Sequence, residues 1–363
     1  MWYNTKATRL LNIDYPILQG PFGGGLSSVE LVATVSNAGG LGGYGAYTMR
    51  PEEIIEIDKQ IRSATDRPYN LNLWVSDTDA PGGAASDAQY MQAKQAFGAY
   101  FDEAGIPFPE KPASFQSRFA NQLQAVLDIK PPVFSFMFGI LPADVLEQCR
   151  RLGIKTVGAA TTPDEAIALD HAGVDMIIAS GFEAGGHRPS FLASAEASTT
   201  GTFVLLQLIR EKVKTPVIGA GGIADGRGIA AAMTLGADAV QVGTAFLACD
   251  ESGALPIHKQ MLFSDAAKYT MLSRAFTGRL GRGLTSRIGS EQANKAAHLP
   301  FPLQTTLMSS LRKAALDQQK WDMVLFWGGQ VAPLLKHRKA ETLMRSLVEE
   351  TAAFFAHNKT LQL

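Results

Sequence analysis

The chain has little cysteine and almost no net charge, and both features exclude some classes of binding site and partner. Its two cysteines, Cys149 and Cys249, lie far apart and form no CxxC pair or Cys/His cluster. A disulfide framework and a zinc site are therefore not expected, and no metal site is predicted. With 33 basic and 34 acidic residues, the formal net charge is −1, which offers no basic surface for nucleic acid or an anionic membrane. We expect a small molecule as the partner instead.

The sequence also lacks the long apolar stretches that would place it in a membrane. It contains no run of roughly eighteen consecutive apolar residues, the length that a membrane-spanning helix needs. The N-terminal stretch MWYNTKATRLLNIDYPILQG lacks the basic region and long apolar core of a secretion signal. We therefore expect a soluble, cytoplasmic protein. The sequence leaves open whether it is a monomer or a homodimer.

The most regular pattern in the chain is a short apolar run followed by a break and a helix-like stretch. Runs this short that are apolar on both faces are typical of strands buried in a parallel sheet. Eight strands are predicted, at Pro16 to Gln19, Leu41 to Tyr44, Asn70 to Val75, Val133 to Met137, Lys155 to Gly158, Met176 to Ser180, Val217 to Ala220 and Ala239 to Val242. Helices that open with proline or aspartate are predicted at Pro51 to Ser63, Pro142 to Leu152, Pro163 to Ala172 and Asp225 to Leu235.

Eight alternating units favour a closed α/β barrel of the (β/α)8 type, the TIM barrel. A doubly wound sheet would usually have fewer strands and a GxGxxG turn after the first, whereas the first strand here ends in QGPFGGGLSS. Residues 1–75 and 131–250 are assigned to the barrel. Residues 76–130, inserted after the third strand, and the C-terminal extension 251–363 are expected to form a smaller, mainly helical lobe over the barrel mouth and the substrate. Within the insertion, helical patterns cover 87–104 and 114–128.

The loops after the last two predicted strands are glycine-rich, at the place where TIM barrels commonly hold phosphate. In GAGGIADGRG, Gly221 and Gly222 would let the backbone approach a ligand, and Asp225 would begin a helix whose amides point toward the site. In QVGTAFLA, Gly243 and Thr244 would add a further amide and a hydroxyl. Ordinary turns also use glycine, but two such loops at this pair of strands favour a phosphate cradle of backbone donors.

Polar side chains also lie near the expected barrel mouth. Asn70 and Asn72 share one face of a strand that is otherwise apolar, so they either reach solvent or hydrogen-bond a polar heterocycle such as a flavin. His187 follows two glycines in SGFEAGGHRPSF, the loop after the sixth strand, where an imidazole is placed for acid–base or charge-stabilising work. Glu183, in the same loop, would orient or cap the loop rather than react.

Several motifs together carry a family resemblance that covers nearly the whole chain. They are ILQGPFGGG, AGGLGGYGA, NLNLW, SGFEAGGHRPSF, VIGAGGIADGRGI, GADAVQVGTAFLACDESG, SRAFTGRLGRGL and FWGGQ. With them the sequence resembles the nitronate monooxygenases, formerly called 2-nitropropane dioxygenases, and TGRLGRG and WGGQ resemble the bacterial class I enzymes in particular. The resemblance implies a barrel that binds FMN, without a metal, and a catalytic His187.

The same resemblance implies a set of FMN-binding residues. The phosphate would lie on Gly222, Gly243 and Thr244, and Asn72, with Asn70 as a further candidate, would contact the flavin. The full predicted set is Gln19, Gly20, Pro21, Phe22, Asn72, Ser180, Gly185, Gly186, Gly221, Gly222, Gln241, Gly243 and Thr244. The chain departs from the class I pattern at Ser180, Pro189 and Phe301, where glutamine, glycine and tyrosine are usual.

The reaction implied by the resemblance is the oxidation of an alkyl nitronate by O2 to a carbonyl compound and nitrite, with propionate 3-nitronate as a candidate substrate. His187 would act as a base toward neutral nitroalkanes and as a hydrogen-bonding partner of the nitronate oxygens. Two alternatives stay open. One is an NAD(P)H-dependent flavin reductase of the enoyl-acyl-carrier-protein or quinone reductase type, and the other is a barrel that binds a phosphate ligand without turnover.

Overall fold

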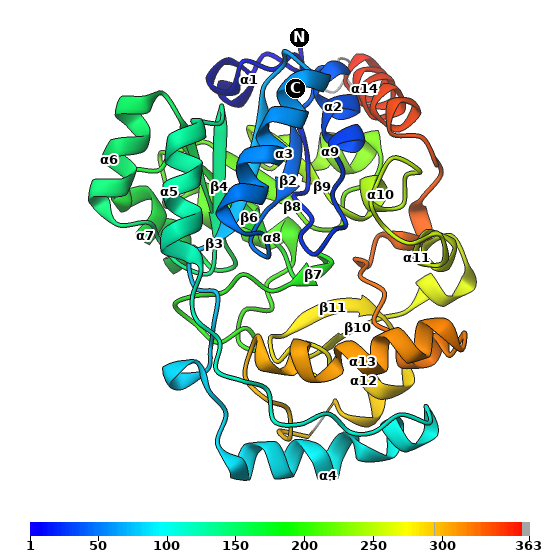
Figure 1. Ribbon diagram of the computed structural model, residues 1–363. Helices are drawn as coiled ribbons and strands as arrows, with labels where there is room; N and C mark the ends of the chain where they lie inside the picture. The colour runs from blue at the N-terminus through cyan, green and yellow to red at the C-terminus, as the bar shows by residue number, and fades with distance from the viewer. Residues whose placement is uncertain (294, 358–363) are drawn as a thin grey trace.

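The computed structural model describes residues 1–293 and 295–357, and its centre is a barrel of eight parallel strands (Figure 1). The strands follow the order β1-β9-β8-β6-β5-β4-β3-β2. Hydrogen bonds from Gln19 N to Leu41 O (2.9 Å) and from Leu41 N to Ile17 O (3.0 Å) join the two edges of the sheet. The strands are β1 Ile17–Gln19, β2 Gly42–Gly45, β3 Tyr69–Trp74, β4 Val133–Met137, β5 Lys155–Ala160, β6 Met176–Ser180, β8 Val217–Ala220 and β9 Ala239–Val242. The predicted TIM barrel is confirmed.

The barrel strands are buried on both faces, which explains why they are apolar almost throughout. Side chains on one face fill the barrel interior, including Leu18, Val157 and Ile218. Alternate side chains point outward and pack under the helices in a second, larger apolar cluster. Helix α1, Lys6–Leu11, contributes Ala7 and Leu11 to the interior cluster and so closes the end of the barrel opposite the lobe (Figure 1).

Helices surround the barrel and begin at the expected signals. Ser28 and Thr162 accept hydrogen bonds from the backbone at the starts of α2 and α7, and proline stands in the first turn of α3 and α7. The surrounding helices are α2 Val29–Asn37, α3 Pro51–Ala64, α5 Phe119–Ile129, α6 Ala143–Leu152, α7 Pro163–Ala172, α8 Thr202–Arg210, α9 Gly226–Thr234 and α14 Ala340–His357. The four helices predicted between strands are therefore present to within a residue at each end.

Two of these helices come from the ranges predicted for the lobe. Helix α5, from the insertion, packs against α3 and β3, and α14, from the C-terminal extension, packs against α9 and α2. Both therefore belong spatially to the barrel. The pattern predicted as a helix from Ser114 becomes helical only at Phe119. Elsewhere, the division into barrel and lobe stays a prediction.

The lobe lies beyond the carboxyl ends of the barrel strands and has its own apolar core (Figure 1). That core includes Phe97, Phe101, Leu303, Leu307 and Leu311. Its elements are α4 Asp87–Glu103, α11 Pro256–Leu262, α12 Arg287–Glu291, α13 Leu303–Asp317, β10 Thr270–Ser273, β11 Gly281–Leu284 and the short 3-10 turns η1 Pro81–Gly83, η2 Asp265–Lys268, η3 Trp321–Met323 and η4 Ala332–Leu334. A short helix, α10 Thr244–Leu247, leads from β9 toward it.

A small antiparallel sheet ties the lobe to the barrel. Its strand order is β10-β11-β7, and β7 is the pair Gly186–His187 in the loop after β6. Gly281 of β11 pairs with His187, and Arg282 pairs with Gly186. The sequence did not predict this sheet, and it places the EAGGH loop directly under the lobe. Across the described parts of the chain, no helix combines the length and the apolar character that crossing a membrane requires.

Candidate active site

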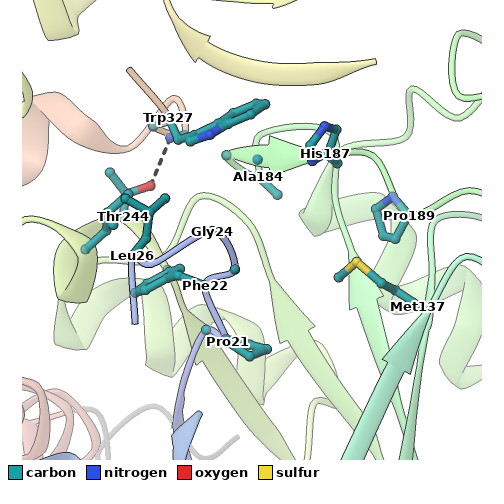
Figure 2. A pocket seen from close by; sticks show the side chains of 18 of the residues that line it. Pro21, Phe22, Gly24, Leu26, Met137, Ala184, His187, Pro189, Thr244 and Trp327 are labelled. Atoms are coloured by element: carbon teal, nitrogen blue, oxygen red, sulfur yellow. Dashed lines mark hydrogen bonds between the residues drawn. The ribbon is translucent and has the colours of Figure 1, made fainter. Parts of the chain in front are cut away.

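A cavity of about 510 Å³ opens at the carboxyl ends of the barrel strands, beneath the lobe (Figure 2). This is the end at which TIM-barrel enzymes place their active sites, and the volume suits a cofactor or a substrate of moderate size. The barrel supplies its glycine-rich loops, and the lobe supplies a wall that includes Phe276, Phe301, Leu325 and Trp327. Nowhere in residues 1–293 and 295–357 do three His, Cys, Asp or Glu side chains gather as a metal site would require.

The predicted FMN-binding residues gather around this cavity, with one exception. Gly20, Pro21, Phe22, Asn72, Ser180, Gly185, Gly186, Gly221, Gly222, Gln241, Gly243 and Thr244 all line it, as does His187. Gln19 does not, because its amide is used inside the barrel wall. There its Oε1 accepts from Gly43 N (2.8 Å) and its Nε2 donates to Gly20 O. Gln19 therefore joins β1 to β2 rather than facing a ligand.

The two asparagines of β3 have different surroundings. Asn70 makes a two-way contact with Ser135, accepting from its backbone N and donating to its Oγ, both at 2.9 Å. Asn72 also donates to Ser135 Oγ (2.9 Å) but lines the cavity, where its amide oxygen remains to accept a hydrogen bond. Both side chains are buried, so a strand end at the protein surface is excluded. Asn72 alone of the pair faces the cavity.

Backbone amides of the glycine loops lie together at the cavity, where the sequence predicted a phosphate cradle. Gly221 and Gly222 have φ values of +105° and +72°, which favour glycine. Within the described chain, the N–H groups of Gly222, Gly243 and Thr244 have no acceptor. A Cβ added to Gly243 would meet nothing nearer than Phe22 Cε1 at 4.0 Å, so open space lies over this backbone. The cradle can therefore hold an anion.

Helix α9 does not contribute to this cradle, contrary to the prediction from Asp225. Asp225 does begin the helix, but its Oδ1 accepts from Gly228 N (2.9 Å). Glu350 of α14 accepts from Gly226 N through Oε2 (3.0 Å). Two of the first three amides of α9, those of Gly226 and Gly228, are therefore occupied by carboxylates of the chain itself.

The WGGQ motif of the tail fixes the EAGGH loop from above. Gln330 N donates to Glu183 O (3.0 Å), and Gly329 N donates to Thr244 Oγ1 (2.9 Å), the dashed line in Figure 2. A Cβ at Gly185 would lie 2.6 Å from Gly329 N, so the two backbones touch because both positions are glycine. This motif therefore connects the loop after β6 to the start of α10.

Glu183 acts as a cap in this arrangement. Its carboxylate accepts hydrogen bonds from Thr202 N (2.9 and 3.1 Å) and from Thr202 Oγ1 (3.0 Å), at the first residue of α8. An anion at this position also suits the positive end of a helix dipole. The interpretation of Glu183 as an orienting rather than a reacting group therefore agrees with its contacts.

His187 projects into the cavity with its backbone held in β7. Its ring lies between Trp327 (4.8 Å between ring centres) and Trp74 (5.2 Å), with Phe301 at 6.1 Å. The next residue, Arg188, is buried and donates to the carbonyls of Ser180, Gly181 and Ser198 at 2.6 to 3.2 Å. These contacts fix the loop and so fix the direction of the imidazole.

The surroundings of His187 keep its imidazole neutral. Burial, and to a smaller extent the positive charge of Arg279, lower the pKa of His187 to about 3. Arg279 is itself paired with Asp79 (Nη2 to Oδ1, 2.5 Å) and lies over the rings of Phe138 and Phe301 at 4.1 and 4.5 Å. Arg279 is the first arginine of TGRLGRG, so this tail motif sets the electrostatics of the site.

Comparison with known proteins agrees with this geometry. Residues 4–350 match the family model described as nitronate monooxygenase. The chain belongs to the nitronate monooxygenase family. It is therefore an enzyme of the oxidoreductase class.

Individual relatives within and near the family support the assignment. The chain is 36% identical over 353 residues to a probable nitronate monooxygenase from Staphylococcus haemolyticus, covering 96% of this chain and 98% of the relative. It is 35% identical to the solved nitroalkane oxidase from Streptomyces ansochromogenes, with a TM-score of 0.87 and coverage of 96% and 99%. FabK from Thermotoga maritima is more distant, at 26% identity, a TM-score of 0.75 and coverage of 99% of both chains.

Two departures from the class I pattern of nitronate monooxygenases change the cavity wall. Phe301 is buried against Trp74 (5.3 Å between ring centres) and beneath Arg279, so the expected tyrosine is replaced by an apolar wall. Pro189, which lines the cavity beside His187, cannot donate a backbone hydrogen bond there. The third departure, Ser180, lies at the end of β6 and lines the cavity as predicted.

Several cavity residues of this chain were not singled out by sequence reasoning. Tyr47 stacks on Trp74 with ring centres 3.5 Å apart, and burial raises its pKa to about 12. Arg312, from α13, also lines the cavity. Tyr47 lies in a βα loop but in no recognisable motif, and Arg312 lies in an ordinary helical pattern. Neither therefore carries a local sequence signal that would place it at the site.

His258 is a second buried histidine at the cavity, and it predicts a pH dependence of stability. It donates from Nε2 to Trp327 O (2.8 Å), and burial lowers its pKa to about 4, with Arg312 and Lys259 acting in the same direction. The unfolded chain binds this proton below about pH 6.5, where the folded chain does not. The part of the unfolding free energy that depends on the proton of His258 is therefore fully present above about pH 6.5. It is lost as the pH falls toward 4.

We expect His258→Gln to weaken this pH dependence, because glutamine does not titrate. The wild-type protein should lose about 3 kcal/mol more than the variant in unfolding free energy between pH 7 and pH 4. Urea unfolding of both proteins at a series of pH values measures the difference. Equal losses in the two proteins would show that His258 takes up its proton with the same affinity in the folded and unfolded states.

Proposed function

We propose that this chain binds FMN and uses O2 to oxidise alkyl nitronates to carbonyl compounds and nitrite. The observation that carries the proposal is the placement of a neutral His187 in one cavity with a cradle of unoccupied backbone amides. An oxidation of this kind needs a cofactor anchored by its phosphate and a polar group beside the reacting carbon. The amide cradle and His187 would meet these two needs at the end of the barrel where such enzymes place their active sites.

The residues around the cavity fit FMN. The amides of Gly222, Gly243 and Thr244 would hold its phosphate, and the open space over Gly243 leaves room for it. Asn72 would accept a hydrogen bond from the ring system. When bound, FMN supplies an electron acceptor that molecular oxygen can reoxidise. The binding of FMN itself is part of the proposal.

The protein's own groups would handle protons and exclude water. His187, neutral and partly enclosed by Trp74 and Trp327, would receive the Cα proton when the substrate is a neutral nitroalkane. The raised pKa of Tyr47 keeps its phenol protonated, so it is available to donate to a negatively charged nitro group. A nitronate arrives already deprotonated and needs only the binding contacts. The low pKa of His187 therefore favours nitronates over neutral nitroalkanes.

Arg312 supports an acidic nitronate, such as propionate 3-nitronate, as the substrate. It lines the cavity, and its guanidinium makes no ion pair or hydrogen bond within the described residues. Arg312 is exposed overall, but the protein around its guanidinium removes part of the solvent and lowers its pKa. A substrate carboxylate would supply the missing counter-charge.

We expect Arg312→Met to raise KM for propionate 3-nitronate about fivefold, while KM for an uncharged alkyl nitronate changes less than about twofold. Methionine keeps much of the aliphatic length and removes the charge. Arg345→Met is the matched control, because Arg345 is exposed on α14 and lies outside the cavity lining. Steady-state kinetics with both substrates measures the effect. Equal changes for the two substrates would remove Arg312 from substrate selection.

An aerobic product assay tests the proposed function. The purified protein should carry a flavin absorbance band and convert a nitronate to nitrite and a carbonyl compound with consumption of O2 and without NADH. A flavin reductase that uses NAD(P)H on the same fold stays the second candidate. A yellow protein that forms no nitrite but consumes NADH would favour that candidate. A protein without flavin would favour the non-catalytic phosphate-binding barrel.

A further inference from the structure

Thr277 holds the ring of His187 from the lobe side. It lies between β10 and β11, in the TGRLGRG motif, and its Oγ1 is 2.9 Å from His187 Nε2. The two residues are 90 positions apart in the sequence. Within the described residues, Thr277 is the only hydrogen-bond partner of this imidazole, and its other close neighbours are the rings of Trp74, Phe301 and Trp327.

The other hydrogen bonds of Thr277 decide which atom carries the shared hydrogen. A threonine hydroxyl has one hydrogen and two lone pairs. Thr277 Oγ1 lies 3.0 Å from the carbonyl oxygen of Arg279, which only accepts, so the hydroxyl hydrogen points there. The backbone N–H of Arg279, at 3.3 Å, donates to one lone pair. The other lone pair is left for His187, so Nε2 must be the donor.

We infer that Thr277 is a positioning residue that holds His187 as the Nε2–H tautomer and so leaves the lone pair of Nδ1 free to act as the base. Nδ1 has no partner in residues 1–293 and 295–357, and it is not among their fully buried, unpaired polar atoms. Since His187 lines the cavity, Nδ1 faces open space there. A threonine in the lobe therefore sets which nitrogen of a barrel histidine can react.

The use of Nδ1 rests on the proposed function. With a neutral nitroalkane, the Cα proton moves to Nδ1, and the C–H electron pair stays on the substrate as the nitronate. If His187 were the Nδ1–H tautomer, no lone pair would face the substrate, and this transfer would stop. With a preformed nitronate no proton is removed, so the tautomer matters less.

Nitrogen NMR of the holoenzyme, labelled with ¹⁵N-histidine, tests the tautomer directly. We expect Nε2 of His187 to resonate as a protonated, pyrrole-type nitrogen and Nδ1 as an unprotonated, pyridine-type nitrogen at pH 7. The His187→Asn variant assigns the signals by their loss. Thr277→Val, which keeps the shape but lacks the hydroxyl, should give a mixture of tautomers, and Thr277→Ser should restore the wild-type pattern.

Kinetics supplies the second readout. Thr277→Val should lower kcat/KM for a neutral nitroalkane about tenfold, with a smaller change for its nitronate, and Thr277→Ser should recover most of the loss. A wild-type spectrum with hydrogen on Nδ1, or an unchanged tautomer in Thr277→Val, would overturn the inference. If the valine variant fails to fold, the wild-type spectrum alone tests the inference. The NMR result does not depend on nitronate turnover, so failure of the proposed function would be seen separately in the product assay.

Discussion

Replacing His187 with asparagine is expected to lower kcat/KM for neutral nitroalkanes by about 10²- to 10⁴-fold, the usual contribution of a general base. Among the described residues, His187 is the only histidine that lines the cavity without a backbone carbonyl as its hydrogen-bond partner, and its ring lies beside Trp74 and Trp327. Preformed nitronates should lose less activity, because their proton is already gone. FMN content should be unchanged, since the side chain of His187 lies outside the amide cradle.

The control for this variant is His171→Asn. His171 is exposed on α7 and lies outside the cavity lining, so its replacement should leave both activities within about twofold of wild type. Parallel assays with a nitroalkane and its nitronate separate the base from the binding contacts. Unchanged turnover of the neutral nitroalkane, with an unchanged pH profile, would show that His187 is not the base.

Gly243→Leu is expected to abolish FMN binding while the fold is retained. The backbone of Gly243 has φ −100°, and an added Cβ would meet only Phe22 Cε1 at 4.0 Å, so the new side chain can begin without a clash and would extend into the cavity. It would occupy the space that the phosphate needs. We expect FMN affinity to fall at least about 100-fold, equivalent to about 3 kcal/mol. Flavin absorbance of the purified variant, and titration with added FMN, measure the loss.

Gly98→Leu is the matched control for that variant. Gly98 lies on α4, outside the cavity lining, and an added Cβ there meets nothing within 4 Å. This protein should bind FMN as wild type does, and both variants should have wild-type far-UV circular dichroism. A Gly243→Leu protein that is purified with a full complement of flavin would place the phosphate somewhere other than the proposed cradle.

The barrel was predictable because its strands are buried on both faces. Such strands are apolar without alternation, and this pattern survives in β4, with the sequence VFSFM, and β6, with MIIAS. The glycine loops after β8 and β9 were predictable for a related reason, since close backbone approach to a ligand restricts the side chain. Gly221, Gly222 and Gly243 therefore lie where the pattern placed them.

Contacts between distant segments account for what the sequence did not predict. Gln19 looks like a polar residue at a strand end, but its amide is taken up by Gly43 of the neighbouring strand. The first amide of α9, that of Gly226, is occupied by the carboxylate of Glu350 from α14, 124 residues away. The amphipathic pattern of α14 shows that one face is buried but not that it is buried against α9.

The residues of the candidate site were likewise only partly predictable from local sequence signals. His187 was found from its place after two glycines in a βα loop, a local signal. Its partner Thr277 and the charge of Arg279 come from the connection that leads into β11, the lobe strand that pairs with β7. Such a strand is short and glycine-rich in this chain, so neither alternation nor apolar character marked it.

Anaerobic mixing of the purified holoenzyme with a nitronate and, separately, with NADH tests the central claim most directly. In the absence of oxygen, electrons taken from a true substrate remain on the flavin and change its absorbance. We predict a rapid change of the flavin band with propionate 3-nitronate and none on the same time scale with NADH. Rapid bleaching by NADH, together with an unchanged spectrum after addition of nitronate, would contradict the proposed function.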